Sequence, residues 1–215
     1  MYRFVFSALL VANSLLTATL LPAHAQDVVR IVALGDSLTA GYGLAPGQGF
    51  PAQLQRALDA AGHKVDIVDA GVSGDTASGG LARLDWSVAP DADAVIVELG
   101  ANDALRGIGP EVTRKALDEI VARLNARNLP VLIAGMVAPP NMGDDYGDRF
   151  NAIYSDLAEK HGTSLYPFFL DGVAGDRSLN QADGIHPTAE GIAVIVENIL
   201  PEVEKLIEQA RGRSQ

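Results

Sequence analysis

The sequence contains no cysteine. Disulfide bonds, a thiolate nucleophile and cysteine-ligated zinc are therefore all excluded. Basic residues are scarce as well, since 16 Lys and Arg stand against 27 Asp and Glu, for a net charge of −11. We therefore expect no nucleic-acid partner and no binding to an anionic membrane surface through a basic patch.

A long apolar run lies at the N-terminus and predicts a removable leader. Arg3 precedes the run Phe4–Leu21, which polar residues such as Asn13 interrupt, so it makes a poor membrane-spanning helix. Ala23-His24-Ala25 supplies the small residues of a signal-peptidase site. We predict a signal peptide at residues 1–25, a mature chain of residues 26–215 with no membrane span, and a periplasmic or secreted product. A retained anchor is the alternative.

The rest of the chain alternates short apolar runs with helical patterns, and no repeat or Gly/Ser linker divides it. We expect a single domain at residues 26–215. Apolar runs without polar alternation are typical of strands covered on both faces. Strand–helix alternation predicts an α/β three-layer sandwich around a central, mainly parallel five-stranded sheet. The expected strands are Val28–Leu34, Val65–Asp69, Ala94–Leu99, Val131–Val137 and Ser164–Tyr166, and the expected helices are Phe50–Ala61, Pro110–Arg127, Tyr146–Lys160 and Ala189–Ala210.

Ser37 and His186 are the candidates for a nucleophile and its base. Ser37 follows the first expected strand, behind a glycine that lets the backbone turn sharply. His186 stands three residues after Asp183, a spacing that can bring the carboxylate to one imidazole nitrogen and leave the other for a serine. Each motif is weak alone, because a serine in such a turn can simply cap a helix.

Two further residues could donate hydrogen bonds to an oxyanion. Asn102 follows the third expected strand and could donate through its side-chain amide. Gly74 follows the second and could donate through its backbone N–H. As single residues, both could equally be ordinary turn residues.

In chain order, these segments resemble the conserved blocks of the GDSL/SGNH hydrolases. Gly35-Asp36-Ser37-Leu38 resembles the first block, Gly74 the second, Gly100-Ala101-Asn102-Asp103 the third and Asp183-Gly184-Ile185-His186 the last. The segment Gly80–Leu84 further resembles the periplasmic acyl-CoA thioesterase/lysophospholipase/arylesterase branch.

The resemblance implies a role for each matching residue. Ser37 would be the nucleophile, His186 the general base and Asp183 its orienting acid. The oxyanion hole would consist of the backbone N–H groups of Ser37 and Gly74 and the side chain of Asn102. We expect Asp103 and Arg106 to hold the neighbouring loop.

The segment 138–148 predicts a long polar loop, and the resemblance to the thioesterase branch implies that this loop covers an acyl-binding groove. We expect Met142 and Tyr146 to contact the acyl chain, and Phe168 and Phe169 to belong to the core. Three aspartates in or near this loop do not match a calcium-binding motif, and no nucleotide-binding fingerprint is present, so we predict no metal and no cofactor.

The predicted function is cleavage of carboxylic ester and thioester bonds of small acyl substrates through an acyl-enzyme, by a monomer. Two alternatives remain open. One is a carbohydrate acetyl esterase on the same fold, and the other is a catalytically inactive lipid- or glycan-binding module.

Overall fold

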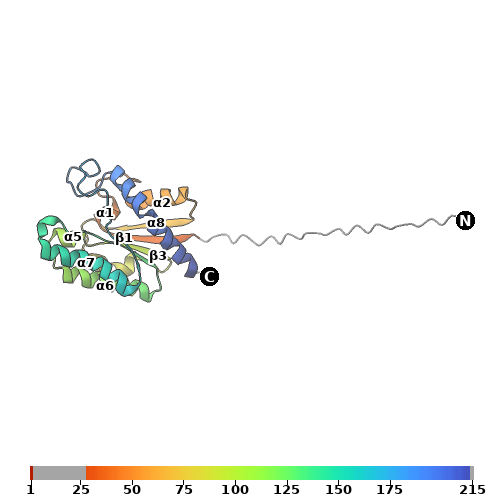
Figure 1. The fold of residues 1–215 in the computed structure, drawn as a ribbon, viewed down its shortest axis with the longest axis horizontal. Helices are drawn as coiled ribbons and strands as arrows, with labels where there is room; N and C mark the ends of the chain where they lie inside the picture. The colour runs from red at the N-terminus through yellow and green to blue at the C-terminus, as the bar shows by residue number, and fades with distance from the viewer. Residues whose placement is uncertain (2–27, 214–215) are drawn as a thin grey trace.

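The computed structural model describes Met1 and residues 28–213; apart from Met1, the predicted signal peptide lies outside the described residues. A five-stranded sheet runs through the centre of the molecule (Figure 1) in the order β2-β1-β3-β4-β5, and every pairing is parallel. The strands are β1 (Val29–Gly35), β2 (Val65–Gly71), β3 (Ala94–Glu98), β4 (Val131–Ala134) and β5 (Ser164–Tyr166). The predicted parallel sheet is therefore confirmed.

Burial along the strands explains why their sequences are apolar without alternation. All five residues of β3 and six of the seven in β1 are buried, because these strands lie in the sheet interior with helices on both faces. The edge strand β2 is only partly buried and carries two aspartates. Strand β4 ends at Ala134, earlier than predicted, and the chain continues through Met136 and Val137 into a loop.

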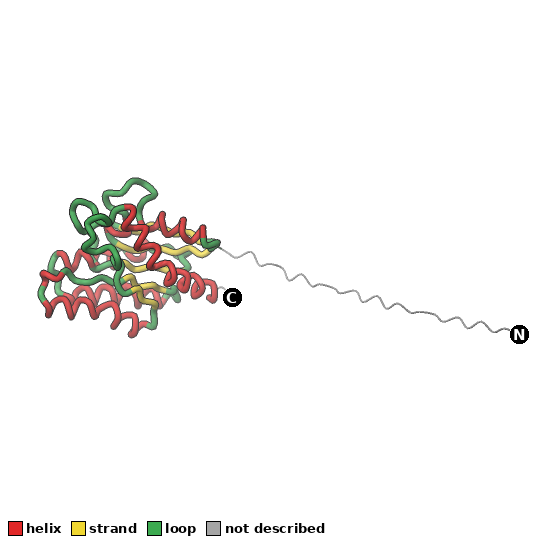
Figure 2. The backbone as a smooth tube through the Cα atoms, turned by 45° about the horizontal axis from the view of Figure 1, so that its top comes forward, coloured by secondary structure: helices red, strands yellow, loops and turns green. Residues whose placement is uncertain are grey.

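Helices cover the two faces of the sheet and complete the three layers (Figure 2). On one face α2 (Phe50–Ala60) packs against α8 (Ala189–Arg213), and on the other α6 (Pro110–Ala126) packs against both α3 (Ala77–Ala82) and α7 (Asp144–His161). Short elements fill the turns: α1 (Ser37–Ala40), α4 (Leu84–Ser87), α5 (Ala101–Leu105) and the 3₁₀ turn η1 (Pro140–Met142). None of the helices in the described part of the chain is long and apolar enough to cross a membrane.

Helix α8 runs without division past Pro201, where the sequence predicts a kink or a break. Pro201 lies on the exposed side of the helix, so water can solvate the carbonyl that loses its hydrogen bond there. Beyond it, Val203, Leu206 and Ile207 remain buried and hold the second half of the helix against the core.

Helix α7 begins at Asp144, inside the segment that the sequence predicts to be a loop. Asp144 and Asp145 occupy its first turn, where carboxylates interact favourably with the helix dipole. The true loop after β4 is consequently shorter than predicted, and Met142 closes the 3₁₀ turn before the helix.

Because the strands are parallel, their carboxyl ends meet at one edge of the sheet. Ser37 follows β1, Gly74 follows β2 and Asn102 follows β3, so three of the candidate residues emerge together at this edge. Ligand sites of open α/β sheets form at this edge.

Candidate active site

A hydroxyl, an imidazole and a carboxylate lie in line at the carboxyl edge of the sheet. His186 Nε2 is 2.9 Å from Ser37 Oγ, and His186 Nδ1 is 2.7 Å from Asp183 Oδ2. The other carboxylate oxygen of Asp183 accepts hydrogen bonds from the backbone N–H groups of Ile185 and His186. Together, the hydrogen bond from the imidazole and these two backbone donors lower the pKa of Asp183 to about 2. The carboxylate is thus ionised at neutral pH and can only accept, which orients the Nδ1–H toward it.

The turn that carries Ser37 is built by its neighbours. Asp36 caps α1, with its Oδ1 accepting from the backbone N–H of Leu38 at 2.9 Å. Thr39 Oγ1 donates to Glu98 Oε2 at 2.7 Å, directly beneath the turn. A Cβ added to Gly35 would lie 2.0 Å from Thr39 Oγ1, so only glycine fits before the Asp36–Ser37 pair.

Two carboxyl groups are buried behind this turn, those of Asp36 and Glu98. The sequence offered Asp36 only as a possible helix cap, which it is, and it assigned no role to Glu98. Asp36 and Glu98 are 0% and 1% exposed. Burial raises the pKa of Asp36 to about 6, and burial together with the nearby Asp36 raises the pKa of Glu98 well above its usual range. With a pKa of about 6, Asp36 is mostly ionised above that pH, and its charge is one cause of the raised pKa of Glu98. The cue in the sequence was a glutamate within an otherwise apolar strand.

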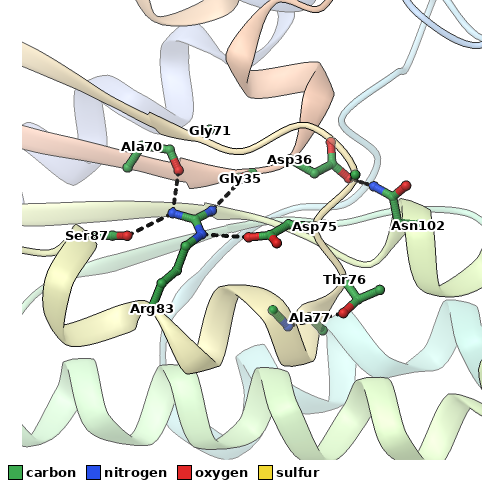
Figure 3. A network of polar contacts seen from close by, with 12 residues as sticks. Gly35, Asp36, Ala70, Gly71, Asp75, Thr76, Ala77, Arg83, Ser87 and Asn102 are labelled. Carbon is green, nitrogen blue, oxygen red and sulfur yellow. Dashed lines mark hydrogen bonds and ion pairs between the residues drawn. The ribbon is translucent and has the colours of Figure 1, made fainter.

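Polar side chains connect Asn102, in α5, and Gly74, in the loop after β2, to neighbouring segments. Asn102 Nδ2 donates to Asp36 Oδ2 at 2.9 Å, which joins α5 to the nucleophile turn (Figure 3). Gly74 has φ +86°, in the region that favours glycine. Arg106 Nη2 donates to the Gly74 carbonyl at 2.7 Å, which joins that loop to the end of α5.

Asp103 strengthens the same connection from inside the protein. Its side chain is fully buried and accepts from the backbone N–H of Ala77 at 2.8 Å and from Thr113 Oγ1 at 2.9 Å. These contacts confirm that Asp103 and Arg106 hold the loops beside Asn102.

Gln181 is a further residue that sequence reasoning missed. Its Nε2 donates to the carbonyls of Tyr42 and Pro187, so it joins the loop after α1 to the segment that carries His186. The ring of Tyr42 lies against the His186 imidazole, with the ring centroids 4.6 Å apart. No local motif marks a glutamine as such a bridge, because its two partners are far apart in the sequence.

Next to Ser37 opens a cavity of about 450 Å³ with mostly apolar walls. Ser37, Asn102 and His186 are among its lining residues, which come from five segments of the chain: residues 36–38, 101–105, 136–140, 168–175 and 180–186. The apolar wall residues include Leu105, Val137, Phe168, Leu170, Ala174 and Ile185. The cavity therefore combines a few polar groups around Ser37 with mostly apolar walls, as small-molecule sites commonly do.

The structure does not place Met142 and Tyr146 in this cavity. Neither belongs to its lining; the Tyr146 hydroxyl donates to the carbonyl of Ile108 at 2.8 Å, and its ring stacks on Phe150. Phe168 was predicted to be core but lines the cavity, whereas its neighbour Phe169 is fully buried as predicted.

A parallel sheet with serine, histidine and aspartate in line at its carboxyl edge is the arrangement of a serine hydrolase. The chain belongs to the GDSL-like Lipase/Acylhydrolase family, whose model matches residues 33–194. It is 38% identical to Esterase TesA of Pseudomonas aeruginosa over 93% of this chain and 99% of that one. It is 35% identical to Thioesterase 1/protease 1/lysophospholipase L1 of Escherichia coli K12, over 87% of this chain and 89% of the relative.

Solved structures agree with this assignment. The crystal structure of AlinE4, an esterase of the SGNH-hydrolase family, superposes with a TM-score of 0.71 at 44% identity, covering 84% of this chain and 97% of that one. The predicted fold class and family are thus confirmed, and the chain is an SGNH-type esterase or thioesterase.

Proposed function

We propose that this protein hydrolyses carboxylic esters and thioesters of acyl substrates through an acyl-enzyme on Ser37. The observation that carries the proposal is the continuous line from Ser37 Oγ through His186 to Asp183, with separations of 2.9 and 2.7 Å. As Ser37 Oγ attacks the acyl carbon, His186 Nε2 takes its proton, and Asp183 stabilises the imidazolium that forms. The alcohol or thiol leaves with that proton, and water then repeats the sequence on the acyl-enzyme.

We further propose that three groups hold the oxyanion: the backbone N–H groups of Ser37 and Gly74 and the amide of Asn102. Among the described residues, neither backbone N–H donates to another protein group. Asn102 uses one amide hydrogen on Asp36 and has a second available for substrate. One such donor contributes about 3–4 kcal/mol to lowering the barrier.

The cavity supports an acyl chain as the bound part of the substrate. Its walls are apolar and its volume is about 450 Å³, whereas an acetyl group would occupy only a small part of it. We therefore favour medium-chain acyl substrates over acetylated carbohydrates, the substrates of the alternative acetyl esterase. The names of the relatives above, an esterase and a thioesterase, support the same choice.

Hydrolysis of p-nitrophenyl esters from acetyl to dodecanoyl, and of acyl-CoA thioesters, tests the proposal. We expect turnover to peak above acetyl and to vanish in Ser37→Ala. An optimum at acetyl would favour a deacetylase. Absence of turnover from a folded protein that still binds acyl ligands would favour the inactive binding module.

Export and assembly state are also part of the proposal. We propose that the leader at residues 1–25 directs the chain out of the cytoplasm, and that the mature enzyme works as a monomer. N-terminal sequencing of the protein from cell fractions should begin at Gln26 in the periplasm or medium, and light scattering should give the mass of one chain. A membrane-bound product starting at Met1 would contradict the first part.

A further inference from the structure

Arg83 lies behind the active site and contacts three of the segments that build it (Figure 3). Its Nη2 donates to the carbonyl of Gly35 at 2.8 Å, and its Nη1 donates to the carbonyl of Ala70 at 2.8 Å. Its Nε donates to Asp75 Oδ2 at 2.6 Å, and the Arg83 side chain is only 14% exposed. One side chain therefore joins the ends of β1 and β2 to the loop after β2.

The partners of Arg83 are direct neighbours of the proposed oxyanion donors. Gly35 stands two residues before Ser37, and Asp75 directly follows Gly74. The Gly35 carbonyl also accepts from the backbone N–H of Val72, so the two segments meet at this point. Arg83 therefore contacts both segments that carry the Ser37 and Gly74 N–H groups.

The segment after β3 is joined to the other two by the contacts described above. Asn102 and Asp36 join it to the segment after β1, and Arg106 joins it to the segment after β2. The segments after β1 and β2 are joined by the backbone hydrogen bond from Val72 to Gly35, and Arg83 is the side chain that contacts both. Only a planar guanidinium offers donors in several fixed directions, so lysine cannot reproduce this set of contacts.

We propose that Arg83 is a positioning residue that sets the spacing of the two backbone donors of the oxyanion hole. This inference rests on the proposed function. Arg83 lines no part of the cavity and would not touch the substrate, so it acts on the transition state only through the peptide groups that it holds. A donor displaced by about 1 Å can reduce the rate about 100-fold. Substrate binding depends on the cavity walls and should hardly change.

Arg127 offers a matched control. Its Nη1 and Nη2 donate to the carbonyls of Val88 and Ala89 at 2.9 and 2.8 Å, much as Arg83 does with Gly35 and Ala70. Arg127 follows α6 and precedes β4, so it lies at the amino ends of the parallel strands, opposite the active site. Loss of Arg127 removes two carbonyl contacts of the same kind, whereas Arg83 also bonds to Asp75 and Ser87, and only the Arg83 contacts adjoin the active site.

The test measures kcat, KM and thermal unfolding of the mature enzyme and of Arg83→Met, Arg83→Lys and Arg127→Met, with a p-nitrophenyl ester. We expect Arg83→Met to lower kcat about 10- to 100-fold with KM within about threefold of the parent, and Arg83→Lys to lower it about 10-fold. Arg127→Met should also lower Tm, because two hydrogen bonds are lost, but should keep kcat within about twofold.

Either of two results would overturn the inference: a folded Arg83 variant with parental kcat, or an Arg127→Met variant that loses kcat to the same extent. If Arg83→Met does not fold, Arg83→Lys decides the question. Failure of the proposed function is seen separately, as equal activity of the parent and Ser37→Ala.

Discussion

Replacing Asp36 with asparagine should make the protein more stable at neutral pH and less active. Asp36 is fully buried, and chiefly that burial raises its pKa from the ordinary 3.8 to about 6. Holding it ionised in the folded state therefore costs about 3 kcal/mol above pH 6. Asparagine removes this cost, and it is an equally good helix N-cap for the N–H of Leu38.

The sign of the pH dependence follows from the direction of the shift. Because the pKa is raised on folding, the contribution of Asp36 to stability is complete below about pH 3.8 and is lost as pH rises through about 6. The difference in free energy of unfolding between Asp36→Asn and the parent should therefore rise by about 2.5 kcal/mol between pH 4 and pH 8. Any constant cost of the substitution cancels in this comparison.

Activity should change in the opposite direction. Asp36 Oδ2 accepts from the Asn102 amide, which we assign to the oxyanion hole. An asparagine at this position can present a second amide instead of a carboxylate oxygen, so Asn102 loses its orientation. We expect kcat to fall about 10- to 100-fold, less than complete removal of a donor would cause.

Urea unfolding from pH 4 to pH 8, combined with ester hydrolysis at pH 7.5, measures both effects. The exposed Asp148, on α7, provides a control, and Asp148→Asn should show a small difference at all pH values. A stability difference for Asp36→Asn that stays constant across this range would refute the reasoning, because it would show that Asp36 carries no buried charge.

Three further predictions concern the triad, the cavity and the nucleophile turn. Asp183→Asn should lower kcat about 10⁴-fold with little change in KM, because the imidazole loses the acceptor that selects its tautomer; a loss below 10-fold would contradict this role. Ala174→Phe should shift the acyl-chain optimum toward shorter esters, whereas Met142→Ala should leave it unchanged, as chain-length profiles will show. Gly35→Ala should lower the free energy of unfolding by about 2 kcal/mol or more, measured by urea denaturation, because the new Cβ would overlap Thr39.

The sheet and the polar residues of the site could be predicted because their signals are local. Apolar runs of five to seven residues indicate buried parallel strands, and each polar candidate follows such a run directly. Parallel strands then bring Ser37, Gly74 and Asn102 to one edge without further information. Asp183 and His186 lie three residues apart in one short turn, so their spacing in the sequence was enough to predict their contact.

The cavity walls could not be predicted because they depend on packing between distant segments. Tyr146 was expected at the acyl chain, but α7 directs its hydroxyl to the carbonyl of Ile108. Phe168 and Phe169 are adjacent and chemically identical, yet one lines the cavity and the other fills the core. The hydrogen bonds of Arg83 join residues 35, 70 and 75, and no sequence pattern within one segment predicts them.

The cavity walls and the catalytic frame are made by different residues. The wall side chains Leu105, Val137, Leu170 and Ile185 make none of the side-chain hydrogen bonds that join the segments after β1, β2 and β3. Those bonds come from other residues, among them Arg83, Asp36 and Arg106. Mutational drift in the walls can therefore alter which acyl groups enter while the chemistry stays intact. Such modularity favours evolvability: a lineage can explore new substrates through single substitutions, and a protein engineer can randomise the walls without rebuilding the catalyst.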